Sequence, residues 1–208
     1  MKKRIIILIS EVLFFTLISS ILIASDCKKP SMPSDKDWNS WIGGIKILAL
    51  ESGISEKTIK YLDNVRPKSK ILLRDKCQVE STITFNEYLY YRIDKARIVA
   101  GKKLFKKYQT ELENISEFFN IQSRFIVSIL GLESYYGKNQ GTINTIDAVT
   151  TLAFDRRRSD FYKKQLIALL KIIDNGFNIE DLVGSWGGAI GMPQFIPTTY
   201  LDSGYDWN

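Results

Sequence analysis

The sequence predicts a mainly α-helical protein. Apolar residues recur at three- and four-residue spacing through most of the chain after residue 33, as on the buried face of a helix. Hydroxyl residues precede several of these stretches, and glycine or proline follows them, as expected for helix starts and stops. The apolar and charged fractions, 45% and 25% of 208 residues, are ordinary for a globular protein.

The first 25 residues have the layout of a secretory signal peptide. Lys2, Lys3 and Arg4 precede an apolar run over residues 5–24, and the small residue Ser25 follows it. The run is also long enough to cross a bilayer, so an uncleaved anchor that holds the protein at the membrane through residues 5–24 is the second interpretation. Residues 28–33 then form a polar linker.

Composition excludes several classes of site. The chain has no histidine, so Ser-His-Asp catalysis, Cys-His catalysis and His-ligated metals are ruled out. Its two cysteines, Cys27 and Cys77, are too few for a thiolate zinc cage, but they can pair if the protein is exported to an oxidising compartment. The net charge of +6 favours an anionic partner. We find no nucleic-acid-binding motif and predict no nucleic-acid partner.

In the N-terminal half, a first helix is expected from Ser34 to Gly53, with Asp37 beside its cap. Its apolar face comprises Trp38, Trp41, Ile42, Ile45 and Ala49. A second helix starts at Ser55 and carries Ile59, Leu62 and Val65. Residues 71–73 indicate a short extended segment.

Two more helices complete this layer. Thr84 and Glu87 form a capping box at the start of one of them. A long helix is expected over residues 94–119. Its inward residues are Ile98, Phe105, Tyr108, Leu112 and Ile115.

In the C-terminal half, Thr145 starts a helix that carries Ala148, Val149 and Leu152. A charged break at residues 155–158 separates it from a strongly amphipathic helix over residues 159–174.

Residues 121–137 carry the candidate catalytic acid, Glu133. The apolar residues at helical spacing before it are Phe125, Ile126, Ile129 and Leu130. Glu133 shares their face, and a carboxyl group beside an apolar stripe is expected to have a raised pKa, as a general acid requires. Tyr135 and Tyr136 follow as candidate walls of a sugar site, and Gly137 is expected to end the helix. The alternative is a solvated surface glutamate, the usual state of this residue type.

Residues 184–200 form the second informative stretch. Four glycines fall within eight residues there, which permits close approach of the backbone to a ligand. Ser185 and Gln194 offer hydrogen-bonding groups for a sugar. Arg157 and Arg158, in the charged break, can bind an anionic substrate. The alternative for residues 184–200 is a tight turn between packed helices. The alternative for the arginines is a solvated loop.

Together these stretches resemble the lytic transglycosylase B family of exported bacterial enzymes that cut peptidoglycan glycan strands. Residues 131–137 match its Gly-hydrophobic-Glu-Thr/Ser motif, which aromatics and glycine follow. Residues 184–199 match its Gly-Ser-aromatic-x-Gly-Ala-x-Gly-x-x-Gln-Phe-x-Pro-Ser/Thr motif, and residues 84–89 match an earlier Thr-Phe-x-x-Tyr-Leu segment. The resemblance covers about residue 38 to the end and implies a lysozyme-like transglycosylase core with an N-terminal helical layer.

The resemblance also implies an activity: non-hydrolytic cleavage between N-acetylmuramic acid and N-acetylglucosamine that leaves 1,6-anhydromuramoyl ends, with Glu133 as general acid and base. It implies that Ser185, Gln194, Tyr135 and Tyr136 contact sugar and that the arginine pair, Arg157 and Arg158, holds carboxylates of the substrate. Peptidoglycan strands would be the partner and the periplasm the location.

The chain departs from the family after Tyr205. A calcium loop would begin there, with Asp206 and Asn208 at its first and third positions. The remaining ligands are absent from the sequence, so we predict no metal site and no cofactor. Residues 34–208 are expected to form a catalytic domain that is incomplete at its C-terminus, with apolar surface left uncovered and with a separate C-terminal fragment as a candidate partner.

Two other functions remain open at this point. One is a truncated, inactive remnant that binds peptidoglycan. The other is a helical interaction protein held in the membrane by residues 5–24.

Overall fold

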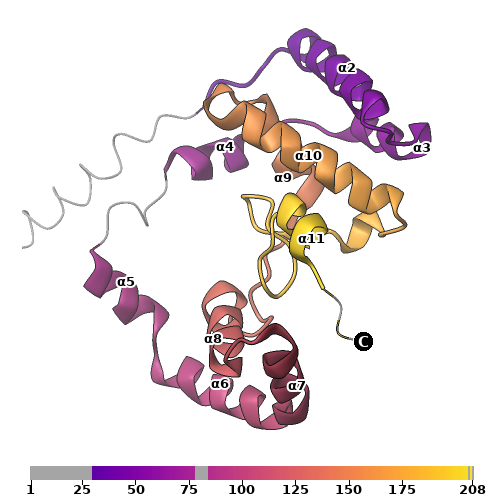
Figure 1. Ribbon diagram of the computed structural model, residues 1–208. Helices are drawn as coiled ribbons and strands as arrows, with labels where there is room; N and C mark the ends of the chain where they lie inside the picture. Colours follow the sequence, from indigo (N-terminus) through magenta and orange to yellow (C-terminus); the bar gives the residue numbers. More distant parts are fainter. Residues whose placement is uncertain (1–29, 78–83, 206, 208) are drawn as a thin grey trace, which may run out of the picture.

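The structure, a computed structural model, describes residues 30–77, 84–205 and 207. These residues are mainly α-helical, which confirms the predicted class. One two-stranded antiparallel sheet joins β1 (Ile143–Asn144) to β2 (Val183–Gly184). Figure 1 shows helices α2, α3, α4, α9, α10 and α11 in one group and helices α5 to α8 in another. The predicted signal peptide, Cys27 and the two calcium-loop residues lie outside the described residues.

Among the described residues, no helix combines the length and apolar character needed to cross a membrane. The apolar run over residues 5–24 lies outside them, so both interpretations of that run stay predictions.

The first two helices form where the sequence predicts them. Helix α2 (Asp35–Glu51) starts with the Ser34 hydroxyl oxygen accepting a hydrogen bond from the Asp37 amide. Helix α3 (Glu56–Ile59) starts in the same way at Ser55 and continues as the 3₁₀ turn η1 (Lys60–Asn64). Nearly all of the predicted apolar face is buried, namely Trp38, Ile42, Ile45, Ala49, Ile59, Leu62 and Val65.

The prediction of an extended segment at residues 71–73 is wrong. These residues belong to helix α4 (Ser69–Lys76). Ile71 and Leu72 are buried in the main core, because the helix lies against α9 (Thr145–Phe154). The Lys68 amide at its start donates to the Thr151 hydroxyl of α9, at 3.1 Å. Tertiary packing thus overrides a run of three apolar residues that is too short to identify a helix by its period.

Helix α9 lies at the centre of the core. Eight of its ten residues are buried: Thr145, Ile146, Ala148, Val149, Thr150, Thr151, Leu152 and Ala153. The 3₁₀ turn η3 (Arg156–Arg158) links it to α10 (Ser159–Asp174), whose predicted bounds are confirmed. The turn η4 (Ile179–Asp181) precedes β2, and helix α11 (Pro197–Ser203) packs on α10.

The second group comprises α5 (Phe85–Arg92), α6 (Lys95–Lys107), α7 (Gln109–Phe119) and α8 (Ser123–Ser134). The predicted capping box of Thr84 and Glu87 is present. The single long helix over residues 94–119 is wrong, because the backbone leaves helical geometry at Tyr108 (φ −113°, ψ 34°). The break lets α6 and α7 both pack against α8, which one straight helix cannot do.

This second group buries few apolar residues. Leu112 of α7 and Val127 of α8 are its buried large apolar side chains among the described residues. Ile98 and Tyr108, expected to point inward, are 46% and 41% exposed. The aromatic rings of Phe118 and Phe119 at the end of α7 contact those of the C-terminal residues Tyr205 and Trp207, with centroids 5.4 to 6.4 Å apart.

The main core predicts a large cost for truncation at Leu166, which is fully buried in α10. We expect Leu166→Ala to lower the free energy of unfolding by about 2–5 kcal/mol, because it removes contacts and leaves a cavity. The matched control is Leu50→Ala on α2, where the side chain is 50% exposed. Urea titrations followed by circular dichroism measure both, and equal losses in the two variants would contradict the core assignment.

Candidate active site

Glu133 lies in the last turn of α8 and is exposed. The expected buried face is wrong: Phe125 and Ile129 are 55% and 51% exposed. The residues of α8 that are buried are Ser123, Val127, Gly131 and Ser134. Three of these four are small residues, which allow the neighbouring helices to approach closely, while Phe125 and Ile129 remain on the outside and Ile126 and Leu130 are half-buried. The expected desolvation of Glu133 by its own helix face is therefore wrong.

The backbone immediately after Glu133 is strained. Helix α8 ends at Ser134. The sequence predicts its end at Gly137, but Tyr135 and Tyr136 already lie outside the helix. Tyr135 (φ 51°), Tyr136 (φ 57°) and Gly137 (φ 83°) all have left-handed backbone geometry. Two of the three are bulky non-glycine residues, for which this geometry is unfavourable and persists only where the surroundings enforce it.

Contacts with α6 hold this turn in place. The Tyr136 hydroxyl donates to the carbonyl oxygen of Arg97, at 3.0 Å. Its ring lies in a gap between two glycines, Gly101 of α6 and Gly131 of α8. A Cβ atom on Gly131 would lie 2.6 Å from the Tyr136 hydroxyl oxygen, so the gap has no room for a side chain. Burial raises the pKa of the Tyr136 phenol, which keeps it a donor.

Polar contacts complete the turn. The Gly137 amide donates to the Ser134 hydroxyl oxygen at 2.9 Å. The Tyr135 ring is contacted by two cations, the guanidinium group of Arg97 at 5.0 Å and the ammonium group of Lys138 at 4.9 Å from its centroid. Arg97 is a residue that sequence reasoning missed, because its role comes from the packing of α6 on the turn.

The structure brings this turn against the glycine-rich stretch. Strand β1 pairs with β2 through Ile143 and Gly184. Gly141 (φ 97°) lies so close to the backbone of Gly184 that no Cβ atom fits between them. The Gln194 side-chain amide donates to the carbonyl oxygens of Gln140, at 3.1 Å, and Gly191, at 2.9 Å. A Cβ atom on Gly137, the last residue of the turn, would lie 3.1 Å from Met192 Cγ. The end of the first stretch and the segment that follows it therefore lie against the second stretch.

Ser185 and Gln194 keep hydrogen-bonding capacity within this surface. The Ser185 hydroxyl oxygen accepts from the Ala189 amide at 3.1 Å, which leaves its hydrogen able to donate. Gln194 has left-handed backbone geometry (φ 53°), and both of its side-chain bonds use the amide nitrogen, so its carbonyl oxygen can accept.

Arg157 and Arg158 converge on a carboxylate that sequence reasoning missed, that of Asp75 in α4. Arg157 donates from Nε to Asp75 Oδ2 at 3.2 Å and from Nη2 to the Asp75 carbonyl oxygen at 3.0 Å. Arg157 Nη2 and Arg158 Nη2 also form ion pairs with the two carboxylate oxygens. The hydrogen bonds to Asp75 raise the pKa of Arg157. The Asp75 side chain is only 2% exposed.

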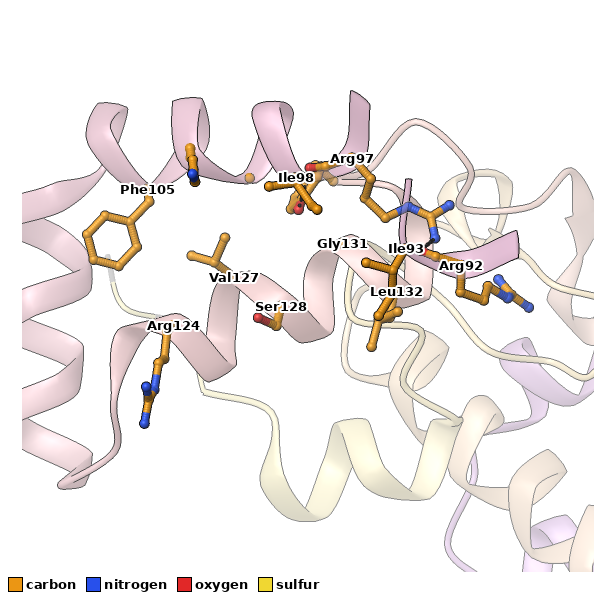
Figure 2. A pocket seen from close by; sticks show the side chains of 13 residues that line it. Arg92, Ile93, Arg97, Ile98, Phe105, Arg124, Val127, Ser128, Gly131 and Leu132 are labelled. Atoms are coloured by element: carbon orange, nitrogen blue, oxygen red, sulfur yellow. Dashed lines mark hydrogen bonds between the residues drawn. The ribbon is translucent and has the colours of Figure 1, made fainter. Parts of the chain in front are cut away.

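Figure 2 shows the groove between α6 and α8, a cavity of about 380 Å³ with an apolar floor. Its lining includes the apolar residues Phe105, Val127 and Leu132 and four cations, Arg92, Arg97, Lys102 and Arg124. Glu133 does not line this cavity. Tyr136 of the turn and Gly131 do line it, so the groove adjoins the turn on the side of α6.

Within residues 30–77, 84–205 and 207, no three His, Cys, Asp or Glu side chains gather in a way that could hold a metal ion. Asp206 and Asn208 lie outside these ranges, so the absence of a calcium site stays a prediction.

Comparison with known proteins finds bacterial lytic transglycosylases that are similar to this chain in sequence and in structure. The chain is 29% identical over 126 residues to the membrane-bound lytic murein transglycosylase B of Escherichia coli K12, a match that covers 58% of this chain and 35% of that protein. SltB3 of Pseudomonas aeruginosa, solved in complex with NAG-NAM-pentapeptide, is 31% identical to this chain, with a TM-score of 0.78. The match covers 82% of this chain and 46% of the SltB3 chain. The soluble lytic transglycosylase SltB1 of the same organism is 30% identical, with a TM-score of 0.69. That match covers 76% of this chain and 56% of the SltB1 chain.

The chain thus spans about half the length of these relatives or less. The likeness to the solved structures confirms the expected lysozyme-like transglycosylase core. A family model described as the transglycosylase SLT domain matches residues 37–208. The chain belongs to the family of proteins with a transglycosylase SLT domain.

Proposed function

We propose that this chain is a peptidoglycan lytic transglycosylase in which Glu133 is the general acid and base. The observation that carries the proposal is the packing of the chain just after Glu133 against the glycine-rich stretch. A Cβ atom on Gly137 would lie 3.1 Å from Met192 Cγ, and the Gly141 and Gly184 backbones are in contact. This packing attaches the helix end that carries Glu133 to the loop that carries Ser185 and Gln194. The lytic transglycosylases among the relatives support the same activity.

The proposed reaction uses one carboxyl group twice. Glu133 gives its proton to the glycosidic oxygen between N-acetylmuramic acid and N-acetylglucosamine, and the bond from that oxygen to the anomeric carbon breaks. The Glu133 carboxylate then takes the proton of the muramoyl C6 hydroxyl, whose oxygen bonds to the anomeric carbon and closes a 1,6-anhydro ring. Most glycosidases need a second carboxylate to act on water or carbon. This route consumes no water, so one carboxylate suffices.

The other site residues bind and orient the substrate. Ser185 donates, and the Gln194 carbonyl oxygen accepts, toward the sugar amide and hydroxyl groups. The arginine pair binds carboxylates of the peptide stem, since guanidinium groups pair well with carboxylates. Tyr135 lines the sugar site, and Tyr136 supports it by holding the turn. Residues 34–208 form the catalytic unit, with glycan strands as partner and the periplasm as location.

One observation favours the second candidate, a peptidoglycan-binding protein without turnover. Glu133 is exposed and the outer face of α8 is uncovered in the described structure. A general acid works best where a neighbouring surface excludes water and raises its pKa. Binding through the arginine pair and the glycine-rich stretch does not need that enclosure.

The first test is a digest of purified peptidoglycan by the full chain, read by mass spectrometry. We expect anhydromuropeptides from the unmodified chain and a loss of about 100-fold or more in their rate of release from Glu133→Gln, which cannot transfer a proton. The control is Glu117→Gln, an exposed glutamate on the neighbouring helix α7.

Each other outcome of the digest has a definite meaning. Products with reducing ends would indicate hydrolysis and a second carboxylate. Retention of full activity in Glu133→Gln would remove the acid assignment. Binding of peptidoglycan by a folded chain that releases no products would favour the second candidate function.

The strained turn generates another prediction. We expect Gly131→Ala to displace Tyr136 from its gap, to lower the rate of anhydromuropeptide release about tenfold and to cost about 1–3 kcal/mol of stability through overpacking. Gly43→Ala on α2 is the matched control, because a Cβ atom there meets no other atom within 4 Å, and alanine favours the helix. Equal rates for the two variants would show that the turn does not depend on Tyr136.

A further inference from the structure

Asp75 is a buried residue to which the proposed reaction assigns no role. It is a nearly fully buried carboxylate, 2% exposed, on a helix of the N-terminal layer. Its two partners, Arg157 and Arg158, lie 82 and 83 residues further along the chain. Burial of a carboxylate is costly unless it is paired on both oxygens. Here each oxygen binds a different guanidinium group, so the carboxylate is fully paired.

The pairing fixes the orientation of both arginines. Arg157 uses Nε and Nη2 on Asp75, which directs its Nη1 group away from the carboxylate. Arg158 uses Nη2, and its guanidinium group lies over the Tyr162 ring, 5.1 Å from the centroid. The two side chains are still 50% and 37% exposed. Asp155 also acts electrostatically on Arg157. Three cations, Arg156, Arg157 and Arg158, stand against the two anions Asp75 and Asp155, so the cluster keeps a net positive charge for a ligand.

The same cluster reaches the glycine-rich stretch. Tyr162 is buried (3% exposed), and a Cβ atom on Gly187 would lie 3.9 Å from its hydroxyl oxygen and 3.7 Å from that of Ser185. A series of contacts therefore runs from Asp75 through Arg158 and Tyr162 to the loop that carries Ser185.

We propose that Asp75 is a positioning residue that holds Arg157 and Arg158 side by side and aimed at the carboxylates of a peptide stem, and so sets the preference for peptide-bearing over peptide-free glycan. Without the carboxylate, two adjacent guanidinium groups repel each other and turn toward solvent. The inference rests on the proposed function, because it assigns the arginines a peptide ligand.

A purely structural role for Asp75 is the alternative, since its contacts also attach α4 to η3. A second ion pair attaches the same helix without touching the arginines: Lys68, the residue before α4, binds Asp147 of α9 at 3.2 Å. Asp147→Asn therefore serves as the matched control. Both substitutions remove one carboxylate charge that anchors α4, and only Asp75→Asn frees the arginine pair.

The experiment compares the full chain, Asp75→Asn and Asp147→Asn by calorimetric titration with two disaccharides, NAG-NAM-pentapeptide and NAG-NAM without peptide. We expect Asp75→Asn to weaken binding of the pentapeptide ligand about tenfold, the value of one charge-assisted hydrogen bond, with unchanged binding of the peptide-free sugar. Asp147→Asn should bind both as the unmodified chain does. Equal weakening for both ligands, or none, overturns the inference.

A second measurement needs no ligand. In ¹⁵N NMR spectra of the side-chain Nε–H groups, Arg157, whose Nε donates to Asp75, should give a slowly exchanging signal in the unmodified chain and in Asp147→Asn, and lose it in Asp75→Asn. Persistence of that signal in Asp75→Asn would overturn the ordering role even if the variant binds less tightly. If the unmodified chain binds neither sugar, the proposed function is wrong, while the signal still decides whether Asp75 orders Arg157.

Discussion

Burial of helix α9 is the constraint on which the rest of the structure depends. The helix has almost no solvent-facing side, so α4, α10 and the loop after β2 must all pack around it. Its first residue follows β1, which pairs with β2 at the start of the glycine-rich stretch. Its last residue precedes η3, where the arginine pair meets Asp75. One buried helix therefore sets the separation of the two parts of the candidate site.

The two groups of helices differ in how they are held. The group around α9 has a continuous apolar core. The group of α5 to α8 depends on a few close contacts: Tyr136 between two glycines, its hydrogen bond to the Arg97 carbonyl, and Leu112 and Val127. Glu133 belongs to this second group. The strained turn that follows Glu133 is thus supported by specific contacts and not by general burial, which makes its geometry sensitive to single substitutions in α6 and α8.

Local signals in the sequence identified elements well where one residue type has one physical role. Hydroxyl caps at Ser34, Ser55 and Thr84 mark helix starts because their oxygens satisfy free amides. The amphipathic pattern of α10 is strong enough to give its bounds. The same reasoning failed on α8, because its buried face is formed mostly by small residues, while Phe125 and Ile129 are exposed. It also failed at Tyr108, since nothing local distinguishes that position from the interior of a helix.

The sequence by itself determined the helical class, the caps, core residues of α2 and α9, the bounds of α10, and the two motif stretches that mark the family. Tertiary structure alone decided that these stretches touch, that α6 and α7 separate, and that Asp75 pairs with the arginines. A carboxylate four residues after Ile71 on an apolar face was a readable signal, but residues 71–73 were too short a run to show the helical period. Contacts between residues 82 positions apart depend on packing of whole helices, and no local pattern encodes that packing.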